Sequence, residues 1–448
     1  MLAAFDEAQH PLERDTPLLP GVEGGQRCRV VDEKENHRAL ARGRRGGSAF
    51  ARWRRARLER ESEQDGQHFG ASILHPAPGF AARVPAIIAG MKAGILGLPL
   101  VGKSTLFQLL TGHAGGGHGG RPEARLGVAR VPDPRVDALG DIFNPKKRTW
   151  ATVEYADVPG VSRGEGAALV DLPALRGVDV LVHVVRAFES DLAPHPEGSI
   201  DPLRDASTLE LELILADLGT VERRIERLAA SIQKAKLPED VAERELFHRL
   251  KDALEAETPL RELNLSADER RRLRGYALLS EKPLLLVANL DEDRTRGADA
   301  FLDSSGLAEF ARRPQVALCA VSAPIEAEMA ELAPEDARAF REDLGLAEPG
   351  LDRVIRTSYE LLGLLSFLTV GEDECRAWTS RRGTRAQLAA GAIHSDIERG
   401  FIRAEVVPFD DFVAVGSLAA CRERGTLRLE GKEYEVRDGD VINFRFAV

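Results

Sequence analysis

The sequence predicts an α/β fold, in which a doubly wound parallel sheet carries an inserted helical hairpin and is followed by a smaller β-rich domain. Short, continuously apolar runs of the kind found in buried parallel strands alternate with stretches of helical periodicity. A glycine-rich loop joins the first of these runs directly to a helix, and a heptad pattern later interrupts the alternation.

The bulk composition narrows the class of protein. The chain has 448 residues, enough for about two or three domains, and a net charge of −11. An acidic protein is not drawn to nucleic acid by its overall field, so DNA is not an expected partner and RNA contact needs a local basic patch. No apolar run reaches the roughly 18 residues of a membrane-spanning helix, and no membrane partner is expected. The cysteines Cys28, Cys319, Cys375 and Cys421 form no CxxC pair or metal pattern, so reduced thiols in a cytoplasmic protein are expected.

Residues 1–90 differ in character from the rest of the chain. Segment 38–60 is rich in arginine, and no helical or strand period organises its few apolar residues. A basic RNA-binding arm is one interpretation, and a transit peptide is another, although acidic residues such as Glu13 and Asp15 speak against the second. The composition favours a disordered extension or a mis-chosen start codon, since Met91 directly precedes the first strand.

The glycine-rich loop has the pattern of a phosphate-binding P-loop. Gly97-x-x-x-x-Gly102-Lys103-Ser104 stands between an apolar strand, 92–98, and a helix, 105–111. Lys103 is expected to reach the β- and γ-phosphates and to assist catalysis, while the Ser104 hydroxyl ligates Mg²⁺. The residues expected to contact the phosphates are Gly97, Leu100, Val101, Gly102, Lys103, Ser104, Thr105 and, from a second motif, Gly160.

That second motif follows in the order that a nucleotide-binding domain requires. The strand 152–158 ends in Asp157-x-x-Gly160, where Asp157 can hold Mg²⁺ through water and Gly160 can sense the γ-phosphate. Mg²⁺ is therefore the expected cofactor, held by Ser104 and Asp157. Further buried parallel strands are expected over 178–188, 282–290 and 315–323.

The choice of base rests on Asn289-Leu290-Asp291-Glu292, which stands where GTPases place Asn-Lys-x-Asp at the end of a strand. Guanine offers two adjacent N–H donors to that aspartate. A glutamate one methylene longer loses the two-point match, a loss on the order of 10⁴-fold where buried polar groups go unpaired. ATP is therefore expected to bind more tightly than GTP. The expected base-binding residues are Asn289, Leu290, Glu292, Ser322 and Ala323. Alternatively, Asn289 merely ends a strand before a solvated acidic turn.

A heptad pattern predicts an antiparallel coiled-coil hairpin. The apolar positions alternate in steps of three and four, after which 236–240 breaks the pattern and 241–257 returns as a second helix. The seam consists of Leu211, Ile214, Leu218, Val221, Ile225, Leu228, Ile232 and Ala235, facing Phe247, Leu250 and Leu254. Ser266 and Glu269 form a capping box that opens one more helix. A plain helical pair packed on the body is the alternative to a projecting hairpin.

From Ser366 onward the pattern changes to strands, tight turns and one helix, 386–393, which suits a β-grasp module. An aromatic residue, Trp378, stands among arginines and is expected to be exposed, so that this strip could stack RNA bases. A solvated charged loop is the alternative interpretation of the strip. Its arginines are Arg376, Arg381, Arg382 and Arg385.

Taken together, these motifs resemble the YchF-type Obg-like ATPases. The resemblance is carried by GLPLVGKSTLF, DVPG followed by RGEG, ANLDE, VSAPIEAEMAEL and the C-terminal stretch from RAWTSRRGTR to VINFRF, and it covers 91–448. It implies a P-loop NTPase domain of the Obg type over 91–204 and 279–363, an inserted coiled-coil hairpin over 205–278, and a C-terminal ubiquitin-like TGS domain over 364–448. It also implies a preference for ATP over GTP and association with ribosomes through the hairpin and the TGS domain, by a protein expected to be a monomer.

Some positions bear on the mechanism that the resemblance implies. Leu100 replaces an asparagine that helps related GTPases hold K⁺, so K⁺ stimulation by that route is not expected. The loop 112–125 has no switch threonine, and Arg121 or a neighbour stands at that place; the family's cysteine in this loop is missing too. Val161, as in the family, replaces the water-orienting glutamine of Ras-like enzymes. His195 matches a family histidine proposed to position water and is the expected catalytic residue beside Lys103.

The sequence thus leads to a slow, Mg²⁺-dependent ATPase whose nucleotide state governs docking to a ribosome and so regulates translation or a stress response. A GTPase of the same fold is one alternative. A nucleotide-gated module that binds ribosomes or RNA with negligible hydrolysis is another, and the missing switch threonine is its main support.

Overall fold

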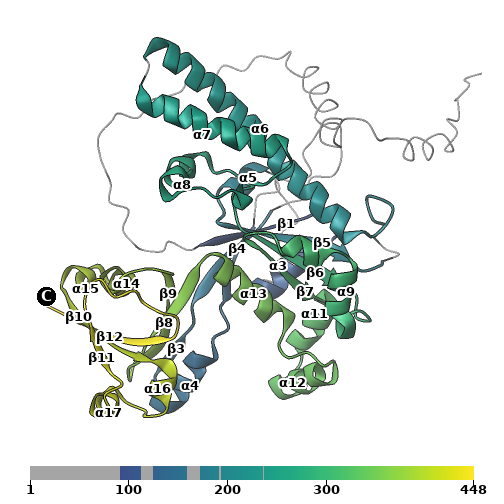
Figure 1. Cartoon of the computed structure of the whole chain (residues 1–448). Coiled ribbons are helices and arrows are strands. Elements are labelled where there is room, and N and C mark those ends of the chain that lie inside the picture. Colours follow the sequence, from purple (N-terminus) through teal and green to yellow (C-terminus); the bar gives the residue numbers. More distant parts are fainter. Residues whose placement is uncertain (1–90, 113–124, 159–171, 191–192, 236, 448) are drawn as a thin grey trace, which may run out of the picture. The chain divides into compact units, whose positions relative to one another are not determined.

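The computed structural model describes residues 91–112, 125–158, 172–190, 193–235 and 237–447, and Figure 1 shows their arrangement. The expectations for residues 1–90, Arg121, Gly160 and Val161 lie outside the described residues.

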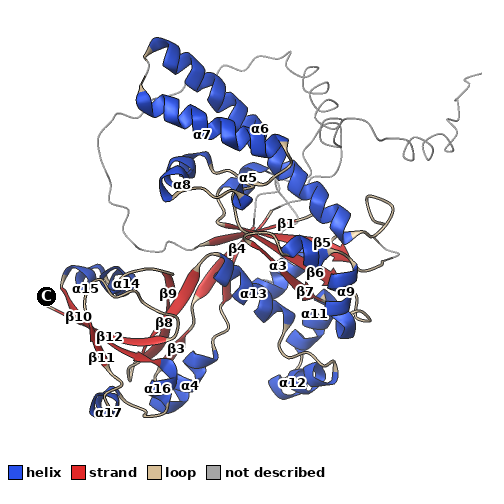
Figure 2. Cartoon of the chain, in the orientation of Figure 1, coloured by secondary structure: helices blue, strands red, loops and turns tan. Residues whose placement is uncertain are grey.

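A six-stranded sheet forms the centre of the nucleotide-binding part, in the order β2-β4-β1-β5-β6-β7 (Figure 2). Its strands are β1 (Lys92–Leu96), β2 (Arg125–Arg130), β4 (Thr152–Asp157), β5 (Val180–Ala187), β6 (Leu284–Leu290) and β7 (Val316–Val321). Neighbouring strands run parallel, except that β2 runs antiparallel to β4. Both β5 and β6 are buried along their whole length, as expected for apolar strands covered on both faces. The predicted doubly wound α/β fold is confirmed.

Helices cover both faces of this sheet. On one face α3 (Lys103–Thr111), α11 (Ala323–Glu331) and α13 (Gly350–Leu361) contact one another, and on the other α9 (Ala298–Ser304) and α10 (Leu307–Ala311) pack with α6. The remaining elements of this part are α4 (Pro134–Phe143), α5 (Leu172–Arg176), α12 (Pro334–Asp343) and the short turns η1 (Leu260–Glu262), η2 (Arg274–Tyr276) and η3 (Thr295–Gly297). This layering leaves the carboxyl ends of the parallel strands free to form a site.

The predicted hairpin consists of α6 (Pro202–Lys234) and α7 (Pro238–Glu255), which lie side by side in Figure 1. The buried seam residues are Ile214, Leu218, Val221 and Leu228 on α6, and Phe247, Leu250 and Leu254 on α7. Ile225 and Ile232 are only half-buried and Ala235 is exposed, because the far end of a two-helix pair has a single partner to pack against. Leu211, near the start of α6, is half-buried as well. Arg224 fixes the pairing of the helices with a bidentate contact to Glu243, at 2.9 and 2.8 Å.

The predicted capping box is confirmed at α8 (Ala267–Leu273). The Ser266 hydroxyl accepts from the Glu269 backbone N–H, and the Glu269 carboxylate accepts from the Ser266 N–H. The buried Asp217 carboxylate of α6 accepts hydrogen bonds from the N–H groups of Leu279 and Ser280, just before β6. The hairpin is therefore tied at its base to the strand that leads back into the sheet.

The C-terminal domain is built on a second six-stranded sheet, in the order β11-β10-β12-β8-β9-β3. Its strands are β8 (Leu364–Thr369), β9 (Glu374–Arg381), β10 (Phe401–Pro408), β11 (Arg428–Glu430), β12 (Asp440–Phe446) and β3 (Lys147–Thr149), and its helices are α14 (Ala386–Ile393), α15 (Ser395–Arg399), α16 (Phe409–Val413) and α17 (Leu418–Glu423). The helix predicted over 386–393 is present with those limits. The short β3 comes from the nucleotide-binding part and pairs in parallel with β9. The sequence did not predict this polar strand, since three residues carry no alternation.

The expectation that Trp378 is exposed is wrong. Its side chain is half-buried, its indole N–H donates to the Thr369 hydroxyl at 2.9 Å, and its ring is stacked against Phe367. The Arg376 guanidinium lies 3.9 Å from the centre of the Trp378 ring. Because neighbouring side chains already use both the N–H and the ring, Trp378 stabilises the sheet in this structure.

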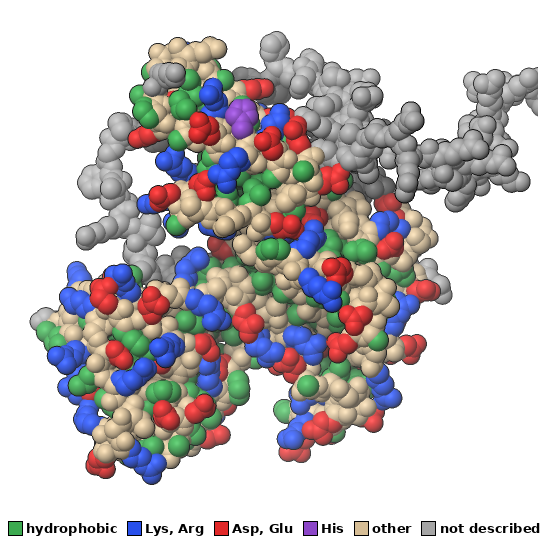
Figure 3. Space-filling model, in the orientation of Figure 1, with side chains coloured by type: hydrophobic (Ala, Val, Ile, Leu, Met, Phe, Trp, Pro, Cys, Tyr) green, Lys and Arg blue, Asp and Glu red, His purple; other side chains and the backbone are tan. Residues whose placement is uncertain are grey.

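The surface of the described residues is mixed in charge. Figure 3 shows Lys and Arg interspersed with Asp and Glu over the visible face of both the hairpin and the C-terminal domain. Among the described residues, no helix is both long enough and apolar enough to cross a membrane. Cys319, Cys375 and Cys421 are buried free thiols, as predicted for reduced cysteines.

Candidate functional site

The glycines of the P-loop are required by close backbone approach. Gly97 has φ 151°, and a Cβ there would lie 2.4 Å from the Val184 carbonyl oxygen of β5. Gly102 has φ 97°, and a Cβ there would lie 2.4 Å from the Asn289 amide nitrogen. A larger residue would clash with the β5 backbone at position 97 and with the Asn289 side chain at position 102. The loop is thus seated directly against the strands that carry the rest of the site.

Lys103 is buried at the start of α3 and its ammonium group lies inside the loop. The Nζ atom donates to the Gly97 carbonyl oxygen at 2.9 Å and to the Leu98 carbonyl oxygen at 2.7 Å. Burial lowers the pKa of Lys103 to about 8, and the nearby Asp157 carboxylate partly opposes this shift. These carbonyls hold the ammonium group inside the loop, where a P-loop lysine meets phosphate oxygens.

Ser104 and Asp157, the expected metal ligands, are brought together by α3 and the end of β4. The Ser104 hydroxyl donates to Asp157 Oδ2 at 3.1 Å, and the Asp157 side chain is only 5% exposed. Hydroxyl and carboxylate oxygens are the donors that Mg²⁺ prefers. A cationic guanidinium, that of Arg125, lies against the same two oxygens, at 3.0 Å from Ser104 Oγ and 2.5 Å from Asp157 Oδ2. The Ser104 hydroxyl and the Asp157 carboxylate therefore already bind one positively charged group, and their oxygens are of the kind that fit Mg²⁺.

Four of the five residues expected to bind the base line a cavity of about 490 Å³ next to the P-loop. It is lined by Gly102, Thr105, Phe188, Glu189, Asn289, Leu290, Asp291, Glu292, Asp293, Ala323, Pro324 and Ala327. Of the expected residues only Ser322 does not line the cavity; it is buried beside Ala323, and among the described residues its hydroxyl has no hydrogen-bond partner. Leu290 is almost wholly buried, whereas Glu292 is exposed.

Asn289 does more than end a strand. Its Nδ2 atom donates to the Val101 carbonyl oxygen of the P-loop at 3.0 Å, and its Oδ1 atom accepts from the Ala323 N–H at 3.2 Å. The buried amide thereby ties the phosphate loop to the loop after β7. Asn289 therefore joins two loops of the site in addition to ending β6, and its contact with a base stays a prediction.

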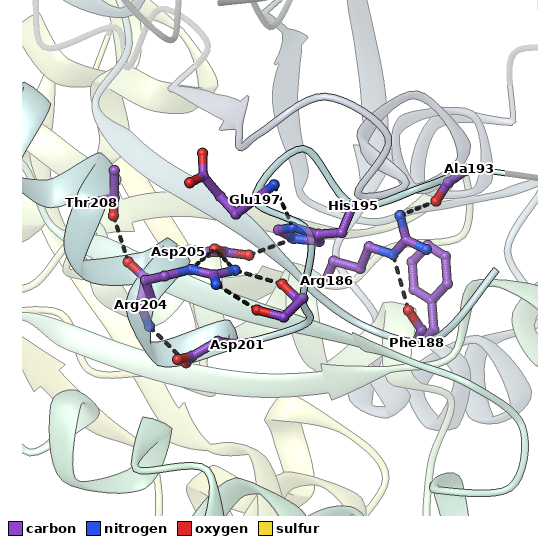
Figure 4. Close-up of polar contacts among 10 residues, drawn as sticks. Arg186, Phe188, Ala193, His195, Glu197, Asp201, Arg204, Asp205 and Thr208 are labelled. Carbon is purple, nitrogen blue, oxygen red and sulfur yellow. Dashed lines mark hydrogen bonds and ion pairs between the residues drawn. The ribbon is translucent and has the colours of Figure 1, made fainter. Parts of the chain in front are cut away.

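Sequence reasoning missed Phe188 and Glu189 as cavity residues. They directly follow β5, and in a parallel sheet the segments that follow the carboxyl ends of the strands form the binding crevice, so their position was the signal. The buried Arg186 holds this segment by donating to the Phe188 carbonyl oxygen at 3.0 Å and the Ala193 carbonyl oxygen at 2.6 Å (Figure 4). Arg125 was missed as well, because a single arginine beside a glycine-rich loop carries no motif.

His195, the expected catalytic residue, lies just before α6 with both ring nitrogens in use (Figure 4). Its Nδ1 atom accepts from the Glu197 backbone N–H at 3.1 Å, and its Nε2 atom lies 2.8 Å from Asp205 Oδ2. These partners assign the proton to Nε2, which donates to the carboxylate. The imidazole is 3% exposed, so in this conformation it has no lone pair available to a water molecule.

Leu100 adopts a backbone conformation that suits glycine or asparagine. Its φ is 63°, and its side chain is 56% exposed. A left-handed conformation costs about 1–2 kcal/mol for an ordinary residue, whereas asparagine tolerates it. Leu100→Asn is therefore expected to raise the free energy of unfolding by about 1 kcal/mol in chemical denaturation. Leu126→Asn, in a strand and 53% exposed, is the control; an equal gain there would attribute the effect to lost apolar surface instead.

Comparison with known proteins places this site in a family. Residues 364–447 match the family model YchF-GTPase_C, described as a protein of unknown function. The "Ribosome-binding ATPase YchF" of Bacillus subtilis (strain 168) is 44% identical over 366 residues, covering 80% of this chain and 100% of the relative. The protein of the same name from Escherichia coli O157:H7 is 42% identical over 369 residues, with the same coverage.

A solved structure agrees with these relatives. The "Structure of the Schizosaccharomyces pombe YchF GTPase" superposes with a TM-score of 0.68 at 30% identity, covering 80% of this chain and 98% of that one. The whole length of the bacterial relatives is matched at more than 40% identity. The chain belongs to the YchF family.

Proposed function

We propose that this chain is a slow, Mg²⁺-dependent ATPase of the cytoplasm that binds ribosomes in a manner governed by its nucleotide. The proposal is supported by the P-loop, by the oxygen pair of Ser104 and Asp157, and by the names of the bacterial relatives as ribosome-binding ATPases. The relative from Schizosaccharomyces pombe is titled a GTPase, so the choice of base needs its own argument.

The preference for ATP rests on one observation, the chemistry of the cavity wall that follows β6. Leu290, in place of the lysine of GTPases, is buried in the hydrophobic core and offers no stem to cover a guanine ring. Glu292, in place of the aspartate, lies on an exposed turn with a side chain one methylene longer. A site that cannot satisfy the N1–H and N2–H₂ donors of guanine leaves them unpaired on burial, which penalises GTP relative to ATP.

The experiment compares the dissociation constants of ATP and GTP in the presence of Mg²⁺. ATP is expected to bind at least about 10-fold more tightly, the equivalent of one well-made hydrogen bond. Glu292→Asp is expected to narrow this ratio by strengthening GTP binding, while Asp299→Glu, a change of equal size at an exposed position of α9 outside the cavity lining, serves as the control. Equal affinities for the two nucleotides in the wild-type protein would overturn the base assignment.

A nucleotide-gated binding module without hydrolysis is the second candidate, and the occupied ring nitrogens of His195 favour it. A phosphate-release assay with ATP, with and without Mg²⁺, separates the two. Slow release that depends on Mg²⁺ supports the ATPase. If the protein bound ATP but released no phosphate above background, the nucleotide-gated binding module would be the supported function.

Ribosome docking is proposed through the hairpin of α6 and α7 and through the C-terminal domain, by a monomeric protein that uses neither DNA nor a membrane. The exposed Arg381 and Arg382 supply a local basic surface, whereas the exposed Arg385 is paired with Glu433. Co-sedimentation with ribosomes, compared with and without ATP, tests this part. If the fraction of the protein that pellets with ribosomes were the same with and without ATP, the proposal that the nucleotide controls docking would be wrong.

A further inference from the structure

Arg125 makes the least expected contact in the site. Its Nη2 atom donates to Asp157 Oδ2 at 2.5 Å and to Ser104 Oγ at 3.0 Å, while Ser104 Oγ itself donates to Asp157 Oδ2 at 3.1 Å. The three groups form a closed triangle. The guanidinium thereby occupies one lone pair of Ser104 Oγ and one carboxylate oxygen of Asp157, Oδ2, on the side where the two groups meet.

The fold puts Arg125 there through strand register. Arg125 is the first residue of β2, and it lies directly opposite Asp157, the last residue of β4, in the antiparallel pair. Side chains of directly opposite residues project from the same face of a sheet and lie close together. The guanidinium also lies 5.8 Å from the centre of the buried Phe107 ring of α3.

Two cations cannot share these oxygens. Mg²⁺ binds oxygen ligands at about 2.1 Å in an octahedron, so a guanidinium hydrogen-bonded to Ser104 Oγ and Asp157 Oδ2 occupies the place of the ion or of the water through which Asp157 would hold it. Conversely, the Asp157 carboxylate is 5% exposed, and a buried carboxylate without a cation is strongly disfavoured. Lys103 is a buried charge as well, and the carbonyl oxygens of Gly97 and Leu98 accept hydrogen bonds from its ammonium group.

We propose that Arg125 is a built-in counter-cation of the metal site, which neutralises Asp157 when no nucleotide is bound and must leave when Mg²⁺ enters. The Arg125 side chain is 48% exposed and stems from the end of an edge strand, so it can turn to solvent without disturbing the core. Metal binding is therefore weakened by competition, and the nucleotide that brings Mg²⁺ must displace the guanidinium. The inference rests on the proposed function only in taking Ser104 and Asp157 as the metal ligands.

The test measures metal binding without nucleotide, using Mn²⁺ as a paramagnetic substitute for Mg²⁺ in electron paramagnetic resonance titrations. Arg125→Ala is expected to bind Mn²⁺ about 10-fold more tightly than wild type, corresponding to the loss of one competing charge-assisted hydrogen bond. Arg125→Lys, which keeps the charge, is expected to stay closer to wild type. Arg130→Ala is the matched control, since Arg130 ends the same strand and lies over Trp150 instead.

Thermal unfolding gives a second readout that does not depend on a measurable affinity. Without metal, Arg125→Ala removes the hydrogen-bonded cation of Asp157 and leaves Lys103 as its nearby positive charge, so this variant is expected to melt at a lower temperature than Arg130→Ala. Added Mg²⁺ is expected to raise its melting temperature more than that of wild type. Equal metal affinities and equal Mg²⁺-induced shifts in Arg125→Ala and wild type would overturn the proposal. If ATP and GTP instead bound with equal affinity, that result would contradict the assignment of the base cavity and would leave the proposal for Arg125 unaffected.

Discussion

Lys103→Ala is expected to weaken ATP binding by about 100-fold or more, the largest single effect on binding in this protein. The Lys103 ammonium is buried and donates to the Gly97 and Leu98 carbonyl oxygens, which are weaker partners than phosphate oxygens. When a nucleotide enters, the same donors can turn to the β- and γ-phosphates with little further loss of side-chain freedom. Removing the amine therefore removes charge-assisted hydrogen bonds that are already positioned for the ligand.

The measurement is the dissociation constant of a fluorescent ATP analogue, together with the free energy of unfolding. Lys282→Ala is a matched control, because Lys282 is also a partly buried lysine that donates to the backbone carbonyls of Arg176 and Val178, before β5. Both variants are expected to lose stability, and only Lys103→Ala is expected to lose nucleotide affinity. If the two variants bound the analogue equally well, Lys103 would be a structural lysine and the P-loop assignment would be wrong.

The sequence predicted those parts of the fold in which local pattern and tertiary packing agree. The apolar runs that became β5 and β6 are buried on both faces, so composition alone marks them as parallel strands. The Ser266 capping box is a local motif whose two hydrogen bonds lie within four residues, and it formed as predicted. Where a pattern is complete within one segment of chain, the structure follows it.

The parts that escaped prediction depend on contacts between distant segments. β3 has three polar residues and exists because β9, more than 200 positions later, pairs with it. The arginines around Trp378 in the sequence predict an exposed aromatic residue. In the structure its indole N–H donates to Thr369 and its ring stacks against Phe367, both on the neighbouring strand. Neither partner can be assigned from the residues around it.

The candidate site divides in the same way. The P-loop and the Asn289 motif have fixed spacing, so the sequence located them, and the structure joins them through the Asn289 amide. Arg125 belongs to no motif and is placed by strand register alone. Sequence reasoning is therefore weakest for single residues, such as Arg125, that strand register brings opposite an expected metal ligand.

His195→Ala is expected to lower the turnover number for ATP by about 100-fold while the Michaelis constant changes by less than about twofold. The proposal is that the imidazole positions or deprotonates the attacking water. The structure adds a condition, because Nδ1 is occupied by the Glu197 N–H and Nε2 by the Asp205 carboxylate. The ring has to leave these partners before it can meet water, and this requirement is consistent with a slow enzyme.

The same variant would also lower turnover if His195 only braced the start of α6, so a second substitution is needed. Asp205 also accepts from the Arg204 guanidinium at 2.9 and 3.0 Å, and it is buried. Asp205→Asn keeps the size and weakens the hold on the imidazole. It is expected to lower the melting temperature and to leave turnover at or above the wild-type rate, measured well below the unfolding transition. Equal losses of turnover in His195→Ala and Asp205→Asn would assign His195 a bracing role, because then the intact contact, and not the free ring, would be what hydrolysis requires.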